Sequence, residues 1–235
     1  MAIPDEAVAL PPVHTAEYVP HLLDVVRKHS VRLLVPTIDS ELPPLAASAA
    51  AFAEAGCRAL ISGDALVRIA GDKWETVTRF AERGVRVPPS WLPDDLPGDL
   101  PDDLFVKPRD GSASQHTYRT RPAALPAILD RVRNPIVQAF VSGDEITVDA
   151  LLDLEGRLVH YVPRLRIRTV GGESVQGVTL DDAGLRDWLV DVLEGVAAFG
   201  GRGPVTLQAF VTEPYRHRLD GLVSSMDLYV YVSQT

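Results

Sequence analysis

Apolar residues in the first 60 positions form two helix-like segments, each followed by a short apolar run. In the first segment, Tyr18, Leu22 and Val26 recur at the spacing of one helix face. The second segment has Ser40 as a candidate N-cap and Gly56 as its stop. The expected order is helix, strand, helix, strand, over residues 18–29, 31–35, 40–55 and 58–61. A strand–helix–strand order predicts parallel strands with helices packed against them.

A further helix is expected to begin at Asp72, which is a good N-cap, and to end at Gly84. Glu75 lies three residues after Asp72, the spacing of a capping box. Lys73 falls in the first turn, where a cation opposes the helix dipole. Two interpretations of Lys73 stay open. Either it is an exposed side chain, or it holds an anion together with the N–H groups of the helix start.

The rest of the chain continues after a loop rich in Pro, Asp and Gly. This loop, residues 88–103, is the best candidate for a domain boundary. Period-two alternation over 145–152 and 157–162 is typical of an antiparallel meander. The strongest helical pattern covers residues 181–199. The other expected elements are strands at 104–107, 115–119, 136–141 and 204–211, a helix at 122–131, and a closing strand within 222–232.

Composition narrows the classes of function. The 235 residues are 46% hydrophobic and 23% charged, an ordinary globular balance with room for one large domain or two small ones. The net charge of −9 and the lack of a basic stripe argue against a nucleic-acid partner. No apolar run reaches the roughly 18 residues of a membrane span. There is no signal-peptide pattern and Cys57 is the single cysteine, so a reducing, cytoplasmic location is expected.

Candidate chemistry begins in the stretch Leu-Phe-Val-Lys-Pro-Arg-Asp-Gly-Ser-Ala-Ser, residues 104–114. A strand fixes Lys107, Gly111 permits unusual backbone angles, and the small residues let backbone N–H groups approach an anion. Ser112 and Ser114 add hydroxyl donors. A lysine at a strand end is usually a solvated surface residue, so the interpretation as a phosphate site depends on the motifs around it.

These motifs, in their order, resemble the ATP-grasp superfamily, specifically its carbamoyl-phosphate-synthase-like branch. The matching features are a lysine at a helix start, the Lys-Pro-Arg-Asp-Gly-Ser loop, the segment 136–149 and the strand at 204–208. The resemblance covers about residues 18–211. It implies an α/β (α+β) ATP-grasp fold, preceded by a partial βαβ domain of the kind that comes before ATP-grasp modules. The implied domains are 1–71 and 72–235, the latter with a nucleotide-loop and hinge part at 103–165 and an incomplete C-terminal part at 166–235.

The resemblance also assigns roles to individual residues. Lys73 and Lys107 match two basic positions that contact nucleotide phosphates, and Glu145 matches the acidic residue next to the ribose. Arg164 resembles a substrate-side arginine, and Gln208 matches a position near the metal. The loop that closes over the phosphates is matched by Gly111, Ser112 and Ser114. The hinge strand that holds adenine is matched by Gln138, Ala139, Phe140 and Val141.

The implied function is that of an ATP-dependent ligase, which activates a carboxylate as an acyl phosphate for attack by an amine or similar nucleophile. ATP and Mg²⁺ are the implied cofactors, and a small-molecule carboxylate and a nucleophile are the implied partners. A homo-oligomer is compatible with the sequence. Such a reaction needs cations on the phosphates and a closed, dry site.

The sequence departs from the family where the metal ligands are expected. Family members carry a Glu-x-Asn-Pro-Arg segment after the strand of Gln208, and this sequence has none. The acidic residues of the tail, Glu213, Asp220 and Asp227, are better interpreted as surface charges. We therefore expect a chain truncated at both ends. The alternative to a ligase is a nucleotide-binding pseudoenzyme or truncated module without turnover, and an unrelated α/β domain is a weaker third possibility.

Overall fold

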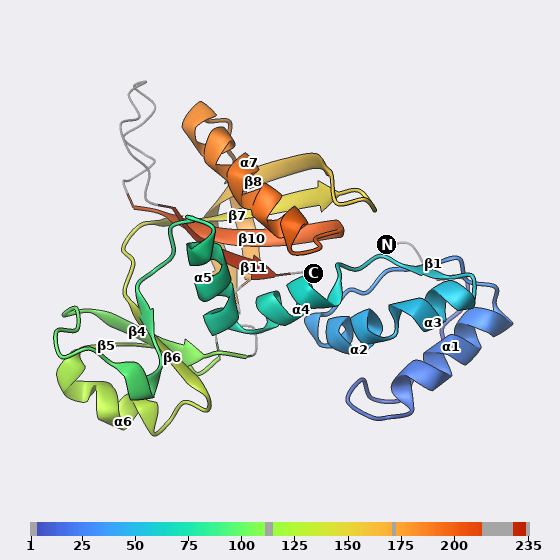
Figure 1. Ribbon diagram of the computed structural model, residues 1–235, viewed down its shortest axis with the longest axis horizontal. Helices are drawn as coiled ribbons and strands as arrows, with labels where there is room; N and C mark the ends of the chain where they lie inside the picture. Colours follow the sequence, from blue (N-terminus) through green and yellow to red (C-terminus); the bar gives the residue numbers. More distant parts are fainter. Residues whose placement is uncertain (1–3, 111–114, 171–172, 213–227, 234–235) are drawn as a thin grey trace.

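The N-terminal part of the chain is a layer of helices beside a short parallel pair of strands (Figure 1). The computed structural model describes residues 4–110, 115–170, 173–212 and 228–233. Helix α1 (Tyr18–Lys28) is confirmed, and β1 (Leu33–Leu34) pairs in parallel with β2 (Arg58–Ala59) as expected. Both strands are only two residues long, so they are shorter than the apolar runs predict.

The prediction of a single helix over residues 40–55 is wrong. The structure has a 3₁₀ turn, Asp39–Glu41, followed by α2 (Leu42–Ala47) and α3 (Ala49–Glu54). The helix is interrupted at Ser48, whose backbone leaves helical geometry with φ −108° and ψ 9°. Ser40 lies inside the 3₁₀ turn and caps nothing there. The buried apolar positions still match the pattern. Leu42 and Leu45 of α2 and Phe52 of α3 are buried in the same core.

Two consecutive helices, α4 (Asp64–Gly71) and α5 (Lys73–Glu82), join this part to the rest. Helix α4 was not predicted from the sequence. Its Val67 packs into the N-terminal core, whereas Leu66 and Ile69 pack into the core of the largest sheet. Helix α4 therefore packs into the hydrophobic cores of both parts of the chain.

The next part is a small antiparallel sheet with strand order β3-β6-β4-β5, at the lower left of Figure 1. Strand β4 confirms the strand expected at 104–107, and β3 was missed inside the proline-rich loop. The elements are β3 (Ser90–Trp91), a 3₁₀ turn (Pro93–Asp95), β4 (Leu104–Pro108), β5 (Tyr118–Thr120), a second 3₁₀ turn (Pro122–Ala124), α6 (Leu125–Leu129) and β6 (Pro135–Ala139). Leu104, Val106 and Val137 form its core together with Leu125 of α6.

The largest sheet has the strand order β11-β10-β7-β8-β9 within the described residues, and all its pairs are antiparallel. The meander is confirmed, but β8 continues eight residues beyond the predicted end at Val162 and pairs with a strand that was not predicted. Strand β11 confirms a closing strand in the tail. The elements are β7 (Asp144–Leu152), β8 (Leu158–Val170), β9 (Glu173–Thr179), α7 (Ala183–Ala198), β10 (Gly203–Val211) and β11 (Leu228–Ser233).

The two faces of this sheet differ in chemistry because side chains alternate along each strand. One face carries Ile146, Val148 and Leu207, which are buried against α7 and against Phe80 of α5. The opposite face, called here the polar face, is lined by polar side chains of three neighbouring strands. They are Glu145, Thr147 and Asp149 of β7, Arg164 and Arg166 of β8, and Thr206 and Gln208 of β10.

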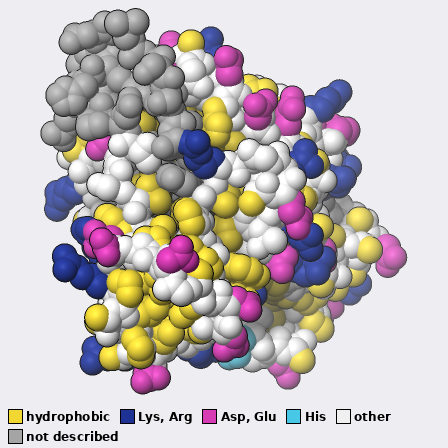
Figure 2. All heavy atoms as spheres, turned by 60° about the vertical axis from the view of Figure 1, so that its left-hand side comes forward, with side chains coloured by type: hydrophobic (Ala, Val, Ile, Leu, Met, Phe, Trp, Pro, Cys, Tyr) yellow, Lys and Arg dark blue, Asp and Glu magenta, His cyan; other side chains and the backbone are white. Residues whose placement is uncertain are grey.

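The outer surface of the small-sheet lobe comes forward in Figure 2. Hydrophobic side chains gather over the lower part of this view, while Lys and Arg side chains lie interspersed with Asp and Glu. No single-sign charged stripe crosses the face shown. Among the helices that the structure describes, none is long and apolar enough to cross a membrane.

Candidate functional site

Lys107 is the centre of the candidate site. It lies near the end of β4 and only 8% of its surface is exposed, which is unusual for a lysine. Burial lowers the pKa of Lys107 well below its ordinary value, and the positive charge of Lys73 lowers it further. The carboxylate of Glu145 acts in the opposite direction. The Nζ atom also lies 5.9 Å from the ring centroid of Phe105. Burial and a neighbouring cation both disfavour the charged form of a lysine, so binding of an anion would stabilise it here.

Lys73 reaches the same place from the first turn of α5. The chain has three lysines, Lys28, Lys73 and Lys107, and the fold brings two of them together. Burial lowers the pKa of Lys73, and the negative charges of Asp110, Asp72 and Asp39 act against this shift. Its Nζ donates to the carbonyl oxygen of Arg109 at 3.3 Å. Lys73 is thus partly buried, so the interpretation as an exposed surface lysine is wrong.

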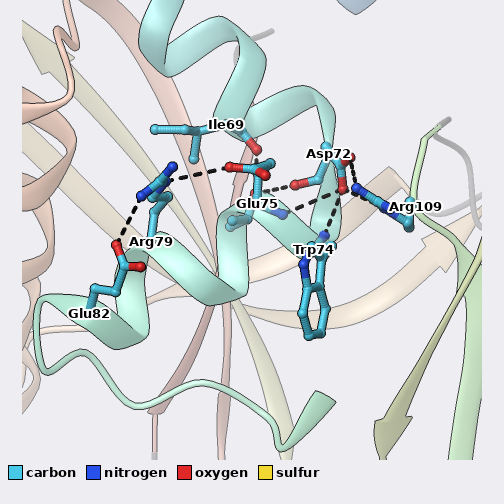
Figure 3. A network of polar contacts seen from close by, with 8 residues as sticks. Ile69, Asp72, Trp74, Glu75, Arg79, Glu82 and Arg109 are labelled. Atoms are coloured by element: carbon cyan, nitrogen blue, oxygen red, sulfur yellow. Dashed lines mark hydrogen bonds and ion pairs between the residues drawn. The ribbon is translucent and has the colours of Figure 1, made fainter. Parts of the chain in front are cut away.

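The start of α5 is built by Asp72, as predicted. The Asp72 carboxylate accepts from the backbone N–H of Trp74 at 2.8 Å and of Glu75 at 3.4 Å (Figure 3). The second hydrogen bond of a capping box, from the backbone N–H of Asp72 to the Glu75 side chain, is not formed, so this part of the prediction is wrong. The N–H of Asp72 donates to the carbonyl of Ile69, and the Glu75 side chain pairs with Arg79 one turn later. Asp72 also accepts from Arg109, an interaction that the sequence analysis missed.

Glu145 and Arg166 form a buried ion pair on the polar face. Arg166 Nη1 lies 2.7 Å from Glu145 Oε1, and 4% of the Arg166 side chain is exposed. Burial raises the pKa of Glu145, while the charges of Arg166 and Lys107 act in the opposite direction. Glu145 therefore lies between the small sheet and the largest sheet, within reach of charges from both. Arg166 was missed in the sequence analysis, where Arg164 two residues earlier was chosen.

The predicted hinge residues lie at the end of β6 and just beyond it. Gln138 is 1% exposed, and its amide donates to the hydroxyl of Ser90 at 2.8 Å. The backbone N–H groups of Ala139 and Phe140 donate to the carbonyls of Pro89 and Asp103. The chain continues through Val141 toward Glu145. The pairing of Gln138 with Phe105 places both side chains, together with that of Lys107, on one face of the small sheet, and the hinge role of Gln138 stays a prediction.

Phe140 places an aromatic surface on this side of the lobe. Its ring centroid lies 6.4 Å from that of Phe105, and the guanidinium carbon of Arg119 lies 3.9 Å above the Phe140 ring. Arg119 is held there by an ion pair of 3.0 Å with Asp103. Phe105 and Phe140 are both only partly buried. A flat base could stack against such a surface.

Arg164 and Gln208 lie in one row across the polar face, on either side of Thr147. Arg164 pairs with Asp149 through Nη2 at 2.7 Å. The two carboxylates of this face, Glu145 and Asp149, are therefore both ion-paired with arginines. Among the described residues, no three His, Cys, Asp or Glu side chains are grouped to hold a metal ion. These side chains do not by themselves fit Mg²⁺, which prefers carboxylates available as ligands.

Several predicted residues lie outside the described part of the chain. They are Gly111, Ser112 and Ser114 of the predicted phosphate loop, and Glu213, Asp220 and Asp227 of the tail. Within the described part, Gly143 is a further residue of interest in the turn before β7. A Cβ atom at this position would overlap the carbonyl oxygen of Val211, so only glycine fits. The turn was expected from Ser142–Gly143–Asp144, but the contact was not.

A separate cavity of about 300 Å³ lies at the start of α7. It is lined by His160, Tyr161 and Arg186, among others, and Arg186 pairs with Asp181 at 2.7 Å. Tyr161 also contributes to the apolar core, on the face opposite to Glu145. This cavity contains neither lysine of the candidate site, so we do not assign the chemistry to it.

Comparison with protein families finds two matches along the chain. The description "ATP-grasp domain" applies to residues 70–203, which is more than half of the chain. The description "PylC-like, N-terminal domain" applies to residues 1–60. Among curated proteins, the comparison finds no match.

Solved structures show the same fold at low sequence identity. The biotin carboxylase domain of 2-oxoglutarate carboxylase from Hydrogenobacter thermophilus, a dimer with MgADP, ADP and bicarbonate, gives a TM-score of 0.70 at 14% identity, covering 97% of this chain and 53% of that one. L-amino acid ligase from Bacillus licheniformis gives 0.69 at 18%, covering 97% and 55%. D-alanine–D-alanine ligase from Bacillus anthracis, complexed with ATP, gives 0.60 at 16%, covering 90% and 70%. The chain thus spans about half the length of the first two proteins.

Proposed function

This chain belongs to the ATP-grasp family, and from that premise we propose that it binds ATP between the small sheet and the polar face of the largest sheet. The observation that carries the proposal is the pair Lys73–Lys107. Two of the chain's three lysines converge from different elements, and burial lowers the pKa of both. A polyphosphate placed there would neutralise two cations that otherwise repel each other.

The adenine would lie on the hinge side of the site. The aromatic surface of Phe105 and Phe140 lies beside Lys107, and the hinge backbone from Ala139 to Val141 runs past it. Glu145, the predicted ribose partner, is ion-paired with Arg166 and interacts electrostatically with Lys107. The arrangement supports a nucleotide with its base at the hinge and its phosphates at the lysines.

The reaction we propose is that of a carboxylate–amine ligase. A carboxylate oxygen attacks the γ-phosphorus of ATP, the bond to the β-phosphate oxygen breaks, and an acyl phosphate and ADP form. An amine then attacks the acyl carbon, and phosphate leaves as the amide forms. Lys73 and Lys107 would bind and orient the phosphates, and Arg164 on the polar face would orient the carboxylate. The ligase names among the similar structures support this reaction class.

The predicted Mg²⁺ stays a prediction. The similar biotin carboxylase domain was solved with MgADP. In this chain, Gln208 offers a neutral amide, and Glu145 and Asp149 are engaged with arginines. We therefore assign no step of the reaction to a metal held by these residues. A cytoplasmic location and a homo-oligomer likewise remain predictions.

Calorimetric titration tests the proposal most simply. We expect one ATP site in the wild-type protein, weaker binding of AMP, and weaker ATP binding in Lys107→Met. Lys28→Met is the matched control, because Lys28 is exposed at the end of α1 and should leave ATP binding unchanged. The proposal would be contradicted by no detectable heat at millimolar ATP, or by equal binding of ATP and AMP.

A further inference from the structure

Arg109 and Asp72 join the two elements that carry the lysines. Arg109 directly follows β4, two residues after Lys107, and Asp72 is the N-cap of α5, one residue before Lys73. Arg109 Nε donates to Asp72 Oδ1 at 3.0 Å, and its Nη2 donates to Oδ2 (Figure 3). This is the two-point geometry in which a guanidinium binds a carboxylate most specifically.

The backbone reinforces the same connection. The N–H of Lys73 donates to the carbonyl oxygen of Arg109 at 3.0 Å, and the Lys73 Nζ donates to the same oxygen at 3.3 Å. The N–H of Arg109 in turn donates to the carbonyl of Asn134, beside β6. Both partners of the ion pair are largely shielded, with 23% of the Arg109 side chain and 28% of the Asp72 side chain exposed.

We propose that Arg109 and Asp72 are positioning residues, which set the place of Lys73 relative to Lys107 for binding the ATP phosphates. This role rests on the proposed function. Its physical reason is repulsion: the charge of Lys73 lowers the pKa of Lys107, so the two ammonium groups favour moving apart before an anion arrives. Holding α5 against the end of β4 keeps the pair in place, so that ATP does not have to order it on binding.

The two tasks of Asp72 can be separated by substitution. Asn is as good an N-cap as Asp, so Asp72→Asn keeps an oxygen for the N–H groups of Trp74 and Glu75 and removes the charge that faces Arg109. Arg109→Gln removes the guanidinium but leaves the backbone carbonyl that accepts from Lys73. Both variants therefore test the ion pair and leave the helix cap and the backbone contact in place.

The experiment is a double-substitution cycle read out by ATP affinity. We expect Arg109→Gln and Asp72→Asn each to raise the Kd for ATP by about fivefold to twentyfold, and the double variant to be no weaker than either single one. In a Lys73→Met background, the effect of Arg109→Gln should shrink to less than about twofold, because Lys73 is the residue being positioned. AMP binding should change less than ATP binding in every variant.

Arg79→Gln is the matched control. Arg79 lies in the same helix, pairs with Glu75 and Glu82, and is exposed. It should leave the ATP affinity unchanged. If Arg109 bound phosphate directly, its loss would weaken ATP equally with and without Lys73, and that result would overturn the positioning role.

Thermal unfolding without nucleotide separates this proposal from the proposed function. The Tm losses of Asp72→Asn and Arg109→Gln should be non-additive, which shows that the ion pair forms in solution. Additive losses would overturn the proposal. A wild-type protein that binds no ATP would contradict the proposed function itself. If the wild type binds ATP and both variants bind it with the same affinity as the wild type, the positioning role alone is refuted.

Discussion

Replacement of Lys107 by Met should change stability and ATP binding in opposite directions. Lys107 is 8% exposed, its pKa is lowered well below the ordinary value by burial and by Lys73, and the charge of Glu145 acts against this shift. Met fills a similar volume without a charge. Exchanging a buried charge for a well-packed apolar side chain is often stabilising, and we expect a gain of about 1–2 kcal/mol in the free energy of unfolding at pH 7.

The same substitution, Lys107→Met, should weaken the binding of ATP. Charge-assisted contacts to phosphate contribute about 1.5–3 kcal/mol each, which corresponds to roughly a 10- to 150-fold rise in the Kd. Lys73→Met is the comparison, and it should weaken ATP binding less, because Lys73 is less buried than Lys107. It should not stabilise the protein, since its Nζ loses a hydrogen bond to the carbonyl of Arg109.

The pH dependence of the stability gain follows from the direction of the pKa shift. The folded protein releases the Lys107 proton at a lower pH than the unfolded chain does, so wild-type stability rises with pH between the two pKa values. The advantage of Lys107→Met should therefore be complete below the folded pKa and disappear as pH approaches about 10.4. Urea unfolding at several pH values, with calorimetry for ATP, measures both effects. A destabilised variant with normal ATP binding would refute the reasoning and make Lys107 a structural residue.

Three further predictions concern the polar face and its turn. Glu145→Gln should be similar to wild type in stability at low pH, where the wild-type carboxyl is protonated, and should gain relative to wild type as pH rises through the raised pKa of Glu145, because burial of the ionised form penalises only the wild type; a relative loss of stability with rising pH in urea unfolding contradicts this. Gly143→Ala should lower the Tm by several degrees, because its Cβ would overlap the backbone of Val211, whereas an unchanged melting curve would show that the turn adapts. Arg164→Gln should raise the KM for the carboxylate with little effect on the Kd for ATP, and a loss confined to ATP binding would exclude the substrate-side role.

Local patterns predicted the strand end at Lys107 and the N-cap at Asp72, both of which follow from short-range rules. Glu145 was assigned by the family resemblance, and its role stays a prediction. Local patterns did not reveal that residues 40–55 are divided into two short helices. The apolar face of this segment is continuous in the sequence, and the interruption at Ser48 follows from how the two short helices pack in the N-terminal core.

Contacts between distant segments were beyond the reach of the sequence. Arg109 is 37 residues from Asp72, and Arg166 is 21 residues from Glu145. The register of β8 against β7 places Arg166 beside Glu145 and Arg164 beside Asp149, and a shift of two residues could place Arg164 opposite Glu145 instead. Strand β9 was missed because its residues include Gly177, which weakens the alternation that marks a strand.

The central claim is that ATP phosphates meet Lys73 and Lys107, and the scarcity of lysine makes this directly observable. Protein labelled with ¹³C at the lysine Cε carbons should give one signal for each of the three lysines, assigned with the variants Lys28→Met, Lys73→Met and Lys107→Met. On titration with ATP, we predict that the signals of Lys73 and Lys107 shift together, with the same midpoint, while that of Lys28 stays in place. Saturating ATP that leaves the signals of Lys73 and Lys107 unmoved would contradict the account.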